Sequence, residues 1–270
     1  MKILMVSDFY HPFIGGMENE VKLISEGLFN KNCEIIICTI GNDFLPKFQN
    51  ENGIRIYRLK GLFQQIPFLY KNPKKKYPPP IADLVLTNHL RNIIKYEKPD
   101  IIHTHGWILY SLLPIKKQLK QKLVTTFHDF GFICPNKWSS QHSKGICNRP
   151  LTHKCITCSL QNYGLLKSFF TYFGIKLNKT FNSDAIIFSN PNLVNKMNYL
   201  NQNKYYLEHP INENVYKPIN INIYKERILC WTKLDRNKGI NIIYKIAKNM
   251  PEYQFDISYI GNDKEYYKKK

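Results

Sequence analysis

Glycines and histidines stand directly after three short apolar runs of the sequence. Gly15 and Gly16 follow the first run, His105 ends a later one, and His128 follows the next. Imidazole can exchange a proton near neutral pH, and a glycine pair that opens a helix lets backbone N–H groups approach a phosphate. Each feature alone also has a plain interpretation, as a tight turn or as a structural histidine. Their shared position after apolar runs favours a common site.

Two lysines near the end of the sequence could serve the same chemistry. Lys233 and Lys238 stand between a predicted strand and a predicted helix, where their charges could neutralise a diphosphate. Solvated surface lysines are the ordinary interpretation in so lysine-rich a chain. The sequence therefore offers these two lysines as candidate phosphate ligands.

A cysteine-rich stretch follows His128. Cys134, Cys147, Cys155 and Cys158 span 25 residues, and the last two are separated by two residues. Thiolates at that spacing are a common half of a tetrahedral zinc site, so these four are candidate ligands of a structural zinc. Because the overall spacing is irregular, free thiols and disulfides remain alternatives.

Strands alternate with helices along the part of the sequence that carries the histidines. The predicted strands are short apolar runs, typical of strands covered on both faces: 3–6, 34–39, 54–59, 100–103, 122–127, 184–188 and 204–208. The predicted helices cover 17–28, 81–96, 107–119 and 191–200. This alternation predicts an α/β fold with a doubly wound parallel sheet, in which ligands bind beyond the carboxyl ends of the strands.

The sequence predicts two domains of unequal size. Residues 1–210 form the first, Rossmann-like domain with a cysteine-rich loop at 131–163, residues 211–224 form a linker, and residues 225–270 start a second Rossmann-like domain. That second part contains one predicted strand–helix–strand unit, which cannot bury a core alone.

Composition excludes several classes of protein. The 270 residues include 39 Lys+Arg and 20 Asp+Glu, a net charge of +19, yet only six of the basic residues are arginines. Proteins that recognise nucleic-acid sequence usually do so with arginine side chains, so no nucleic-acid partner is expected. A hydrophobic share of 43% excludes a disordered chain. No apolar stretch approaches the roughly 20 residues of a membrane span, and we expect a cytoplasmic protein with reduced thiols.

The order of the motifs resembles the GT-B glycosyltransferases of the retaining family-4 type. The matching segments occur in the family's order over essentially the whole chain: Gly15-Gly16 with Glu18 and Glu20, 99–105, 126–129, 209–212 and 233–239. The resemblance implies two Rossmann-like domains that face each other. The acceptor would bind mainly to the first and the nucleotide sugar mainly to the second.

The resemblance also implies a role for each matching residue of the first domain. Gly15, Gly16 and His105 would face the donor diphosphate and the acceptor. His128 would approach the reacting sugar as the catalytic residue. The reaction implied is transfer of a hexosyl group, with retention of configuration, from a nucleotide sugar to a glycan or lipid-linked acceptor, as in polysaccharide biosynthesis.

In the second domain, Lys233 and Lys238 would hold the leaving diphosphate, without a catalytic cofactor. Lys233 stands where the family usually has arginine, so a single ammonium group replaces a planar guanidinium that can donate two parallel hydrogen bonds. The family's second domain also continues to a Glu-rich, sugar-gripping motif that has no counterpart here. We expect a short gene product, a second chain that completes the site, or a non-catalytic relative that binds a glycan, lipid or partner protein.

One segment suggests contact with a membrane surface. Residues 165–176 mix aromatic residues with lysines, as interfacial helices do, and Lys74, Lys75 and Lys76 form a basic cluster. Peripheral contact with the inner face of an anionic membrane is therefore a further expectation. A helix packed on the core, with only its ends in solvent, is the alternative.

Overall fold

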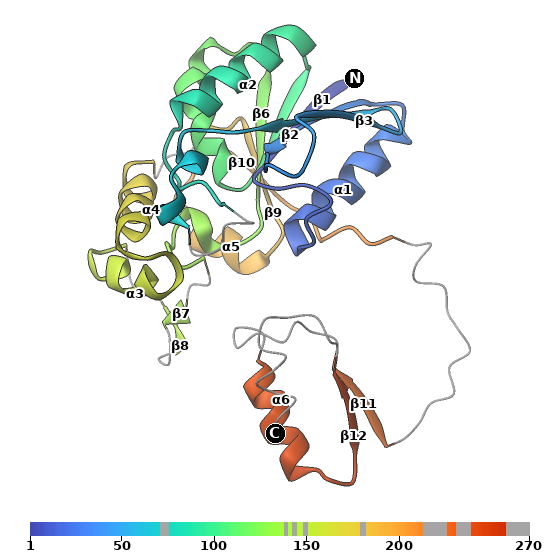
Figure 1. The fold of residues 1–270 in the computed structure, drawn as a ribbon, viewed down its shortest axis with the longest axis vertical. Coiled ribbons are helices and arrows are strands. Elements are labelled where there is room, and N and C mark those ends of the chain that lie inside the picture. Colours follow the sequence, from blue (N-terminus) through green and yellow to red (C-terminus); the bar gives the residue numbers. More distant parts are fainter. Residues whose placement is uncertain are drawn as a thin grey trace. The chain divides into compact units, whose positions relative to one another are not determined.

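The computed structural model describes residues 1–70, 76–137, 140–141, 145–147, 151–178, 182–212, 226–230 and 239–257, without the side chains of 140, 141, 145, 146 and 161. The chain divides into two compact units, Met1–Asn212 and Glu213–Lys270 (Figure 1). The residues that the sequence singles out as catalytic or phosphate-binding fall in the first unit, apart from the two lysines. Lys233 and Lys238 lie outside the described residues, so their predicted role stays a prediction.

An eight-stranded sheet forms the centre of the first unit, in the order β10-β9-β6-β5-β1-β2-β4-β3. The strands are β1 (Lys2–Ser7), β2 (Glu34–Ile40), β3 (Phe48–Glu51), β4 (Ile54–Leu59), β5 (Ile101–His105), β6 (Lys122–Phe127), β9 (Ala185–Phe188) and β10 (Asn203–Tyr206). Neighbours are parallel except β3 and β4. The chain runs outward from β1 and then returns to β5, so the strand order reverses between these two. The predicted α/β class with a doubly wound, largely parallel sheet is confirmed.

Among the described residues of the first unit, five α-helices and several shorter elements connect these strands (Figure 1). The α-helices are α1 (Gly16–Phe29), α2 (Leu84–Glu97), α3 (Lys154–Tyr163), α4 (Leu165–Leu177) and α5 (Pro191–Lys196). The 3-10 helices are η1 (Phe63–Gln65), η2 (Pro67–Leu69), η3 (Trp107–Ser111), η4 (Leu113–Gln118) and η5 (Phe130–Phe132). Two short strands, β7 (Ser140–Gln141) and β8 (Gly145–Ile146), pair antiparallel in the cysteine-rich loop.

Several elements differ from the sequence prediction, and the helix expected over 191–200 ends at Lys196. The single helix expected over 107–119 is the pair η3 and η4. Pro114 in the first turn of η4 has no N–H group to continue a hydrogen-bonded helix from η3. The sequence analysis also missed β3, an edge strand that pairs only with β4 and carries no apolar run. Helix η3 begins two residues after His105, whereas β3 lies at the far edge of the sheet.

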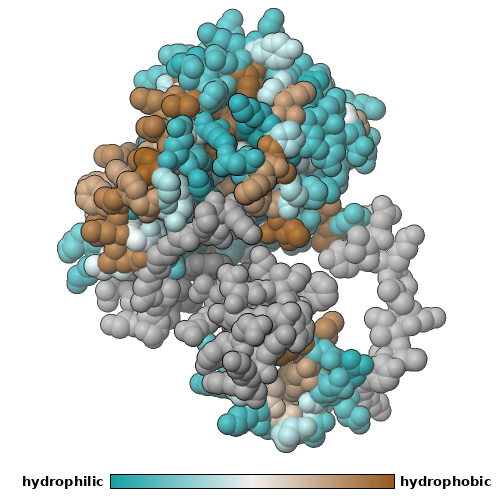
Figure 2. Space-filling model, viewed as in Figure 1, coloured by the Kyte–Doolittle hydropathy of each residue, from teal (hydrophilic) through white to brown (hydrophobic). Residues whose placement is uncertain are grey.

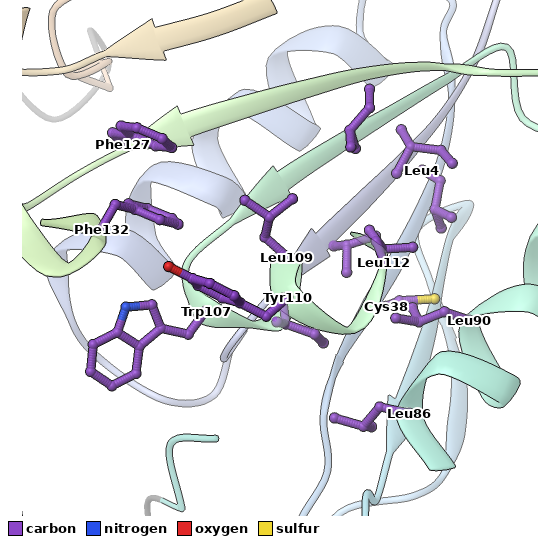
Figure 3. Packing of buried hydrophobic residues seen from close by; sticks show 14 of the residues in the cluster. Leu4, Cys38, Leu86, Leu90, Trp107, Leu109, Tyr110, Leu112, Phe127 and Phe132 are labelled. Atoms are coloured by element: carbon purple, nitrogen blue, oxygen red, sulfur yellow. The ribbon is translucent and has the colours of Figure 1, made fainter. Parts of the chain in front are cut away.

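The core occupies both faces of the sheet, because successive residues of a strand point to opposite sides. Ile3 and Met5 of β1 pack with Val21 of α1 on one face. On the other face, Leu4 and Cys38 join Leu86, Leu90, Trp107, Leu109, Tyr110, Leu112, Phe127 and Phe132 (Figure 3). Covering both faces this way explains why the strands read as continuous apolar runs.

The second unit contains a strand, a helix and a strand within its described residues. These are β11 (Arg227–Cys230), α6 (Ile240–Asn249) and β12 (Gln254–Ile257), and the two strands pair in parallel. Arg227 binds Asp256 across the pair, with its Nε 2.9 Å from the carboxylate. This is the βαβ order that the sequence predicts there.

Candidate functional site

The carboxyl ends of two neighbouring strands bring a pair of histidines into contact. His105 is the last residue of β5, and His128 directly follows β6. His105 Nδ1 and His128 Nε2 lie 2.9 Å apart, and the ring centroids are 5.1 Å apart. The ring of His103, two residues earlier on β5, lies 4.2 Å from that of His105. Since β1 adjoins β5, this edge also adjoins the loop that leads to Gly15 and Gly16.

Glu20 of α1 holds the other side of the His128 ring. Its buried Oε2 accepts a hydrogen bond from His128 Nδ1 at 3.2 Å, and it also contacts Nδ1 of His209, which lies beyond β10. The resemblance had assigned Glu20 no role. The sequence does hold a signal: Glu20 stands three residues after Met17 and four before Ile24, among the apolar positions of α1. A carboxylate on the buried face of a helix needs a partner.

Burial and the contacts within this group shift the pKa values of Glu20 and His105. Burial alone would raise the pKa of Glu20, but its hydrogen bonds to His128 and His209 and their charges outweigh burial and lower it. Burial, with His103 and His128 nearby, holds the pKa of His105 well below its usual value, so His105 is neutral. One arrangement satisfies both hydrogen bonds when Glu20 is ionised: His128 donates from Nδ1 to Glu20 and accepts at Nε2 from His105 Nδ1. Within the described residues, His105 Nε2 is buried without a hydrogen-bond partner.

The same group could hold a metal ion. Oε2 of Glu20, Nδ1 of His128 and Nδ1 of His209 all lie within 4.8 Å of one another, and two imidazoles with one carboxylate suit a divalent cation. Among the described residues, no other set of at least three His, Cys, Asp or Glu has this spacing. In the structure Glu20 Oε2 already contacts both imidazole nitrogens at hydrogen-bond distance. The expectation that catalysis needs no cofactor stays a prediction.

Gly15 and Gly16 form the start of α1, one helical turn before Glu20. A Cβ atom at Gly15 would lie 2.1 Å from Glu18 Oε2, which no side chain could tolerate without displacing that carboxylate. A Cβ atom at Gly16 would meet nothing within 4 Å. The two glycines therefore differ: a side chain at Gly15 would displace the Glu18 carboxylate, whereas Gly16 leaves open space beside the helix N-terminus. Backbone N–H groups at such an end favour an anion.

Asp8, the residue after β1, binds the start of η3 with its side chain. Its buried carboxylate accepts hydrogen bonds from the backbone N–H groups of Trp107, at 2.9 Å, and Ile108, at 2.7 Å. Gly106 adopts φ +88°, and a Cβ atom there would lie 2.3 Å from Asp8 Oδ2. Burial raises the pKa of Asp8 to about 6, despite the opposing charge of Lys137. The sequence analysis missed this contact, which spans about a hundred residues of chain.

The buried histidines should make the first unit sensitive to acid. Burial lowers the pKa of His103 from its usual 6.5 to about 4. Between those values the unfolded chain binds a proton that folded His103 does not, so stability falls as the pH falls. The loss is about 3 kcal/mol. In His103→Gln the amide can still bind Thr126, but it does not titrate. We expect the unfolding free energy of this variant, measured in urea, to fall by about 3 kcal/mol less between pH 6.5 and 4 than that of the unaltered chain.

Asp8→Asn is the opposing control for this measurement. The pKa of Asp8 is raised, so its contribution is present at low pH and lost as the pH rises from 3.8 to about 6. Removing it should steepen the acid loss of stability, whereas His103→Gln should flatten it. A stability difference between either variant and the unaltered chain that is independent of pH would contradict these assignments.

The candidate zinc ligands stand on separate pieces of the cysteine-rich loop. Cys134 follows η5, Cys147 follows β8, and Cys155 and Cys158 stand in α3. All are thiols in the structure, and burial together with the neighbouring Cys155 and Cys147 raises the pKa of Cys158. Within the part of the chain that is described, these sulfurs do not form a group with all ligand atoms inside 4.8 Å. The structural zinc stays a prediction.

A sequence comparison identifies the family. The sequence model of Glycosyltransferase Family 4 matches residues 14–188, which include the glycine pair, Glu20 and both histidines of the site. The chain belongs to Glycosyltransferase Family 4. This confirms the resemblance drawn from the motif order.

Two relatives of this Glycosyltransferase Family 4 chain share about half of its length. An uncharacterized 42.6 kDa protein in the cps region of Klebsiella pneumoniae is 28% identical over 144 residues, which cover 50% of this chain and 39% of that protein. One subunit of the phosphatidylinositol N-acetylglucosaminyltransferase of Arabidopsis thaliana is 26% identical over 137 residues, 49% of this chain and 28% of that protein. The chain thus matches well under half of the length of either relative.

Solved structures confirm the GT-B fold. Sucrose-phosphate synthase from Thermosynechococcus elongatus aligns with a TM-score of 0.64 at 14% identity, over 95% of this chain and 61% of that one. The catalytic domain of starch synthase IV from Arabidopsis thaliana, solved with ADP and acarbose, aligns with a TM-score of 0.54 at 12% identity, over 96% of this chain and 68% of that one. At these identities the likeness concerns the fold alone.

Proposed function

We propose that this chain transfers a sugar, with retention of configuration, from a nucleotide-sugar donor to a glycan or lipid-linked acceptor. Membership of the glycosyltransferase family supports the reaction class. The names of the relatives support the acceptor class, since one belongs to a phosphatidylinositol N-acetylglucosaminyltransferase and the other stands in a cps region. The observation that carries the proposal is the linked trio of Glu20, His128 and His105 at the edge where open α/β sheets bind ligands.

His128 is the catalytic residue in this proposal. With Nδ1 tied to Glu20, Nε2 is the atom that can exchange its His105 partner for a hydroxyl group of the transferring sugar. A polar atom held in place before the substrate arrives costs no reorganisation during the reaction. The donor diphosphate would bind at the N-terminus of α1, beside the open space at Gly16. Lys233 and Lys238 would neutralise the departing nucleoside diphosphate.

Glu20 is the positioning residue of this arrangement. Its carboxylate orients the His128 ring and selects the tautomer in which Nδ1 carries the proton. In Glu20→Gln the amide can present either an oxygen or an NH₂ group to His128, so the tautomer is no longer fixed. We expect the rate of sugar transfer to fall about tenfold or more, while nucleotide-sugar affinity changes little. Steady-state kinetics with the full chain measures both quantities.

The matched control is Glu26→Gln on the same helix. Glu26 pairs with Lys22 on the outer side of α1, at 3.7 Å, and has no contact with either histidine. Its variant should transfer sugar at the rate of the unaltered chain. Equal rates for Glu20→Gln and the unaltered chain would contradict the positioning role.

Calorimetric titration with a panel of nucleoside-diphosphate sugars tests the proposed function itself. We expect one nucleotide-sugar class to bind the full chain, and its sugar to appear on an acceptor in a transfer assay. Binding of glycans without binding of any nucleotide sugar would contradict the transferase proposal and favour a non-catalytic relative.

A further inference from the structure

Helix α4 presents an apolar face to solvent. Leu165, Phe169, Phe173 and Leu177 recur at every fourth residue, which places them on one side of the helix. Leu165 is 67% exposed and Leu177 is 77% exposed, and Leu166 and Phe169 are exposed as well. In Figure 2 brown and tan residues gather where Figure 1 places α4, at the left edge of the first unit. Large apolar side chains in such a continuous row call for a partner.

The opposite face of α4 is already packed, so the outer residues are not needed to hold the helix. Lys167 Nζ donates to Tyr77 O at 2.9 Å, and Ser168, Thr171 and Ile175 are buried. A Cβ atom at Gly174 would lie 2.1 Å from Pro80 O, so the backbone of α4 touches the segment before α2 directly. The helix is therefore fixed on the first unit with its second, apolar side turned outward.

The apolar surface continues from α4 onto the short helices η1 and η2. Phe63 of η1 packs on Phe170 of α4, with ring centroids 6.3 Å apart. Beside it, Leu62 is exposed and Phe68 of η2 is 75% exposed. The outward residues of α4 together with Leu62 and Phe68 are called the α4 patch below.

The two stretches of chain that carry the α4 patch contain lysines and no acidic residues. The sequence contains no Asp or Glu between Glu51 and Asp83, or between Asp129 and Asp184, and these two stretches carry the whole patch. Lys176 stands in the last turn of α4, and Lys76 Nζ donates to Gln64 O of η1 at 2.9 Å. Asp83, whose carboxylate binds the backbone of Phe63, is buried, so it does not face outward there. Exposed apolar side chains edged by lysines complement a surface that is apolar inside and negatively charged outside.

We propose that the α4 patch docks the first unit onto an anionic lipid bilayer. The apolar side chains would enter the boundary between headgroups and acyl chains, while Lys76 and Lys176 contact the phosphates. With 13 residues, α4 is too short to cross a bilayer. Within the described residues, no helix combines the length and hydrophobicity that crossing requires. The contact is therefore with the surface, and it is independent of whether the chain transfers sugar.

Co-sedimentation of the full chain with vesicles tests the proposal. We expect binding to vesicles of phosphatidylcholine mixed with phosphatidylglycerol and much weaker binding to phosphatidylcholine alone. Leu165→Glu and Phe169→Glu should each weaken binding about tenfold, because a charge replaces an apolar side chain that would enter the bilayer. A glutamate at position 165 also suits the first turn of a helix, so that variant should fold. Thermal unfolding checks the folded state of each variant.

Tyr96→Glu is the matched control. Tyr96 is an exposed aromatic residue in the last turn of α2. The α4 patch lies near the other end of this helix, where the carboxylate of its N-cap residue, Asp83, accepts a hydrogen bond from the backbone N–H of Phe63. This variant should bind vesicles like the unaltered chain, whereas a Lys76→Glu, Lys176→Glu double variant should lose the preference for anionic vesicles.

Three results would overturn the proposal. The first is equal binding of Leu165→Glu, Phe169→Glu and the unaltered chain to anionic vesicles. The second is an equal loss of binding in Tyr96→Glu. The third is absence of vesicle binding together with self-association that Leu165→Glu abolishes, which would assign the α4 patch to a second copy of the chain.

Discussion

Replacing Gly16 with tryptophan should abolish binding of the nucleotide sugar while the first unit stays folded. A Cβ atom at Gly16 meets nothing within 4 Å, so an indole side chain can extend from this position without displacing core residues. The same open space borders the N-terminus of α1, where we propose that the donor diphosphate binds. An indole would occupy that space and keep the phosphate away from the backbone N–H groups. We expect affinity to fall at least a hundredfold in calorimetry.

Gly15→Ala provides the contrasting variant. Its methyl group would lie 2.1 Å from Glu18 Oε2, so it should disturb the first turn of α1 and lower the melting temperature. Gly16→Trp should instead melt like the unaltered chain, since its side chain lies in solvent. Retained nucleotide-sugar affinity in a folded Gly16→Trp variant would mean that the glycine pair is only a turn, as an isolated Gly-Gly often is.

The strand ends of this site could be predicted from the sequence because they depend on a local pattern. Apolar runs mark β1, β5 and β6, and parallel strands share one carboxyl edge, so His105 and His128 could be expected near each other. The motif order then pointed to the family. The sequence analysis did not predict α3, because it lies in the cysteine-rich loop, which interrupts the alternation of strands and helices.

The partners of the histidines could not be predicted, because they come from distant parts of the chain. Glu20 lies 108 residues from His128 and 189 residues from His209 in the sequence. These contacts depend on how α1 and the segment after β10 pack at the edge of the sheet, which no local spacing encodes. The tie between Asp8 and the start of η3 has the same origin. Residues that orient a catalytic group are thus harder to predict than the group itself.

His128→Ala should slow sugar transfer about 10²- to 10³-fold and leave nucleotide-sugar affinity nearly unchanged. The imidazole is the group that Glu20 and His105 hold between them, and its Nε2 is the atom we assign to the transferring sugar. Removing one preorganised polar contact of a transition state typically costs 10²- to 10³-fold in kcat. The diphosphate contacts at α1 do not involve this ring, so KM for the donor should move little. Steady-state transfer kinetics across donor concentrations separates the two constants.

Two further variants decide whether the nitrogen atoms of His128 or only its bulk matter. His128→Phe keeps a ring of similar size beside Glu20 but can neither donate nor accept a hydrogen bond. It should therefore be as slow as His128→Ala. His89→Ala removes an exposed histidine from α2, away from the strand ends, and should keep the full rate. If His128→Phe transferred sugar as fast as the unaltered chain, the ring would act by filling space, and the hydrogen-bonded chain from Glu20 to His105 would serve the fold alone.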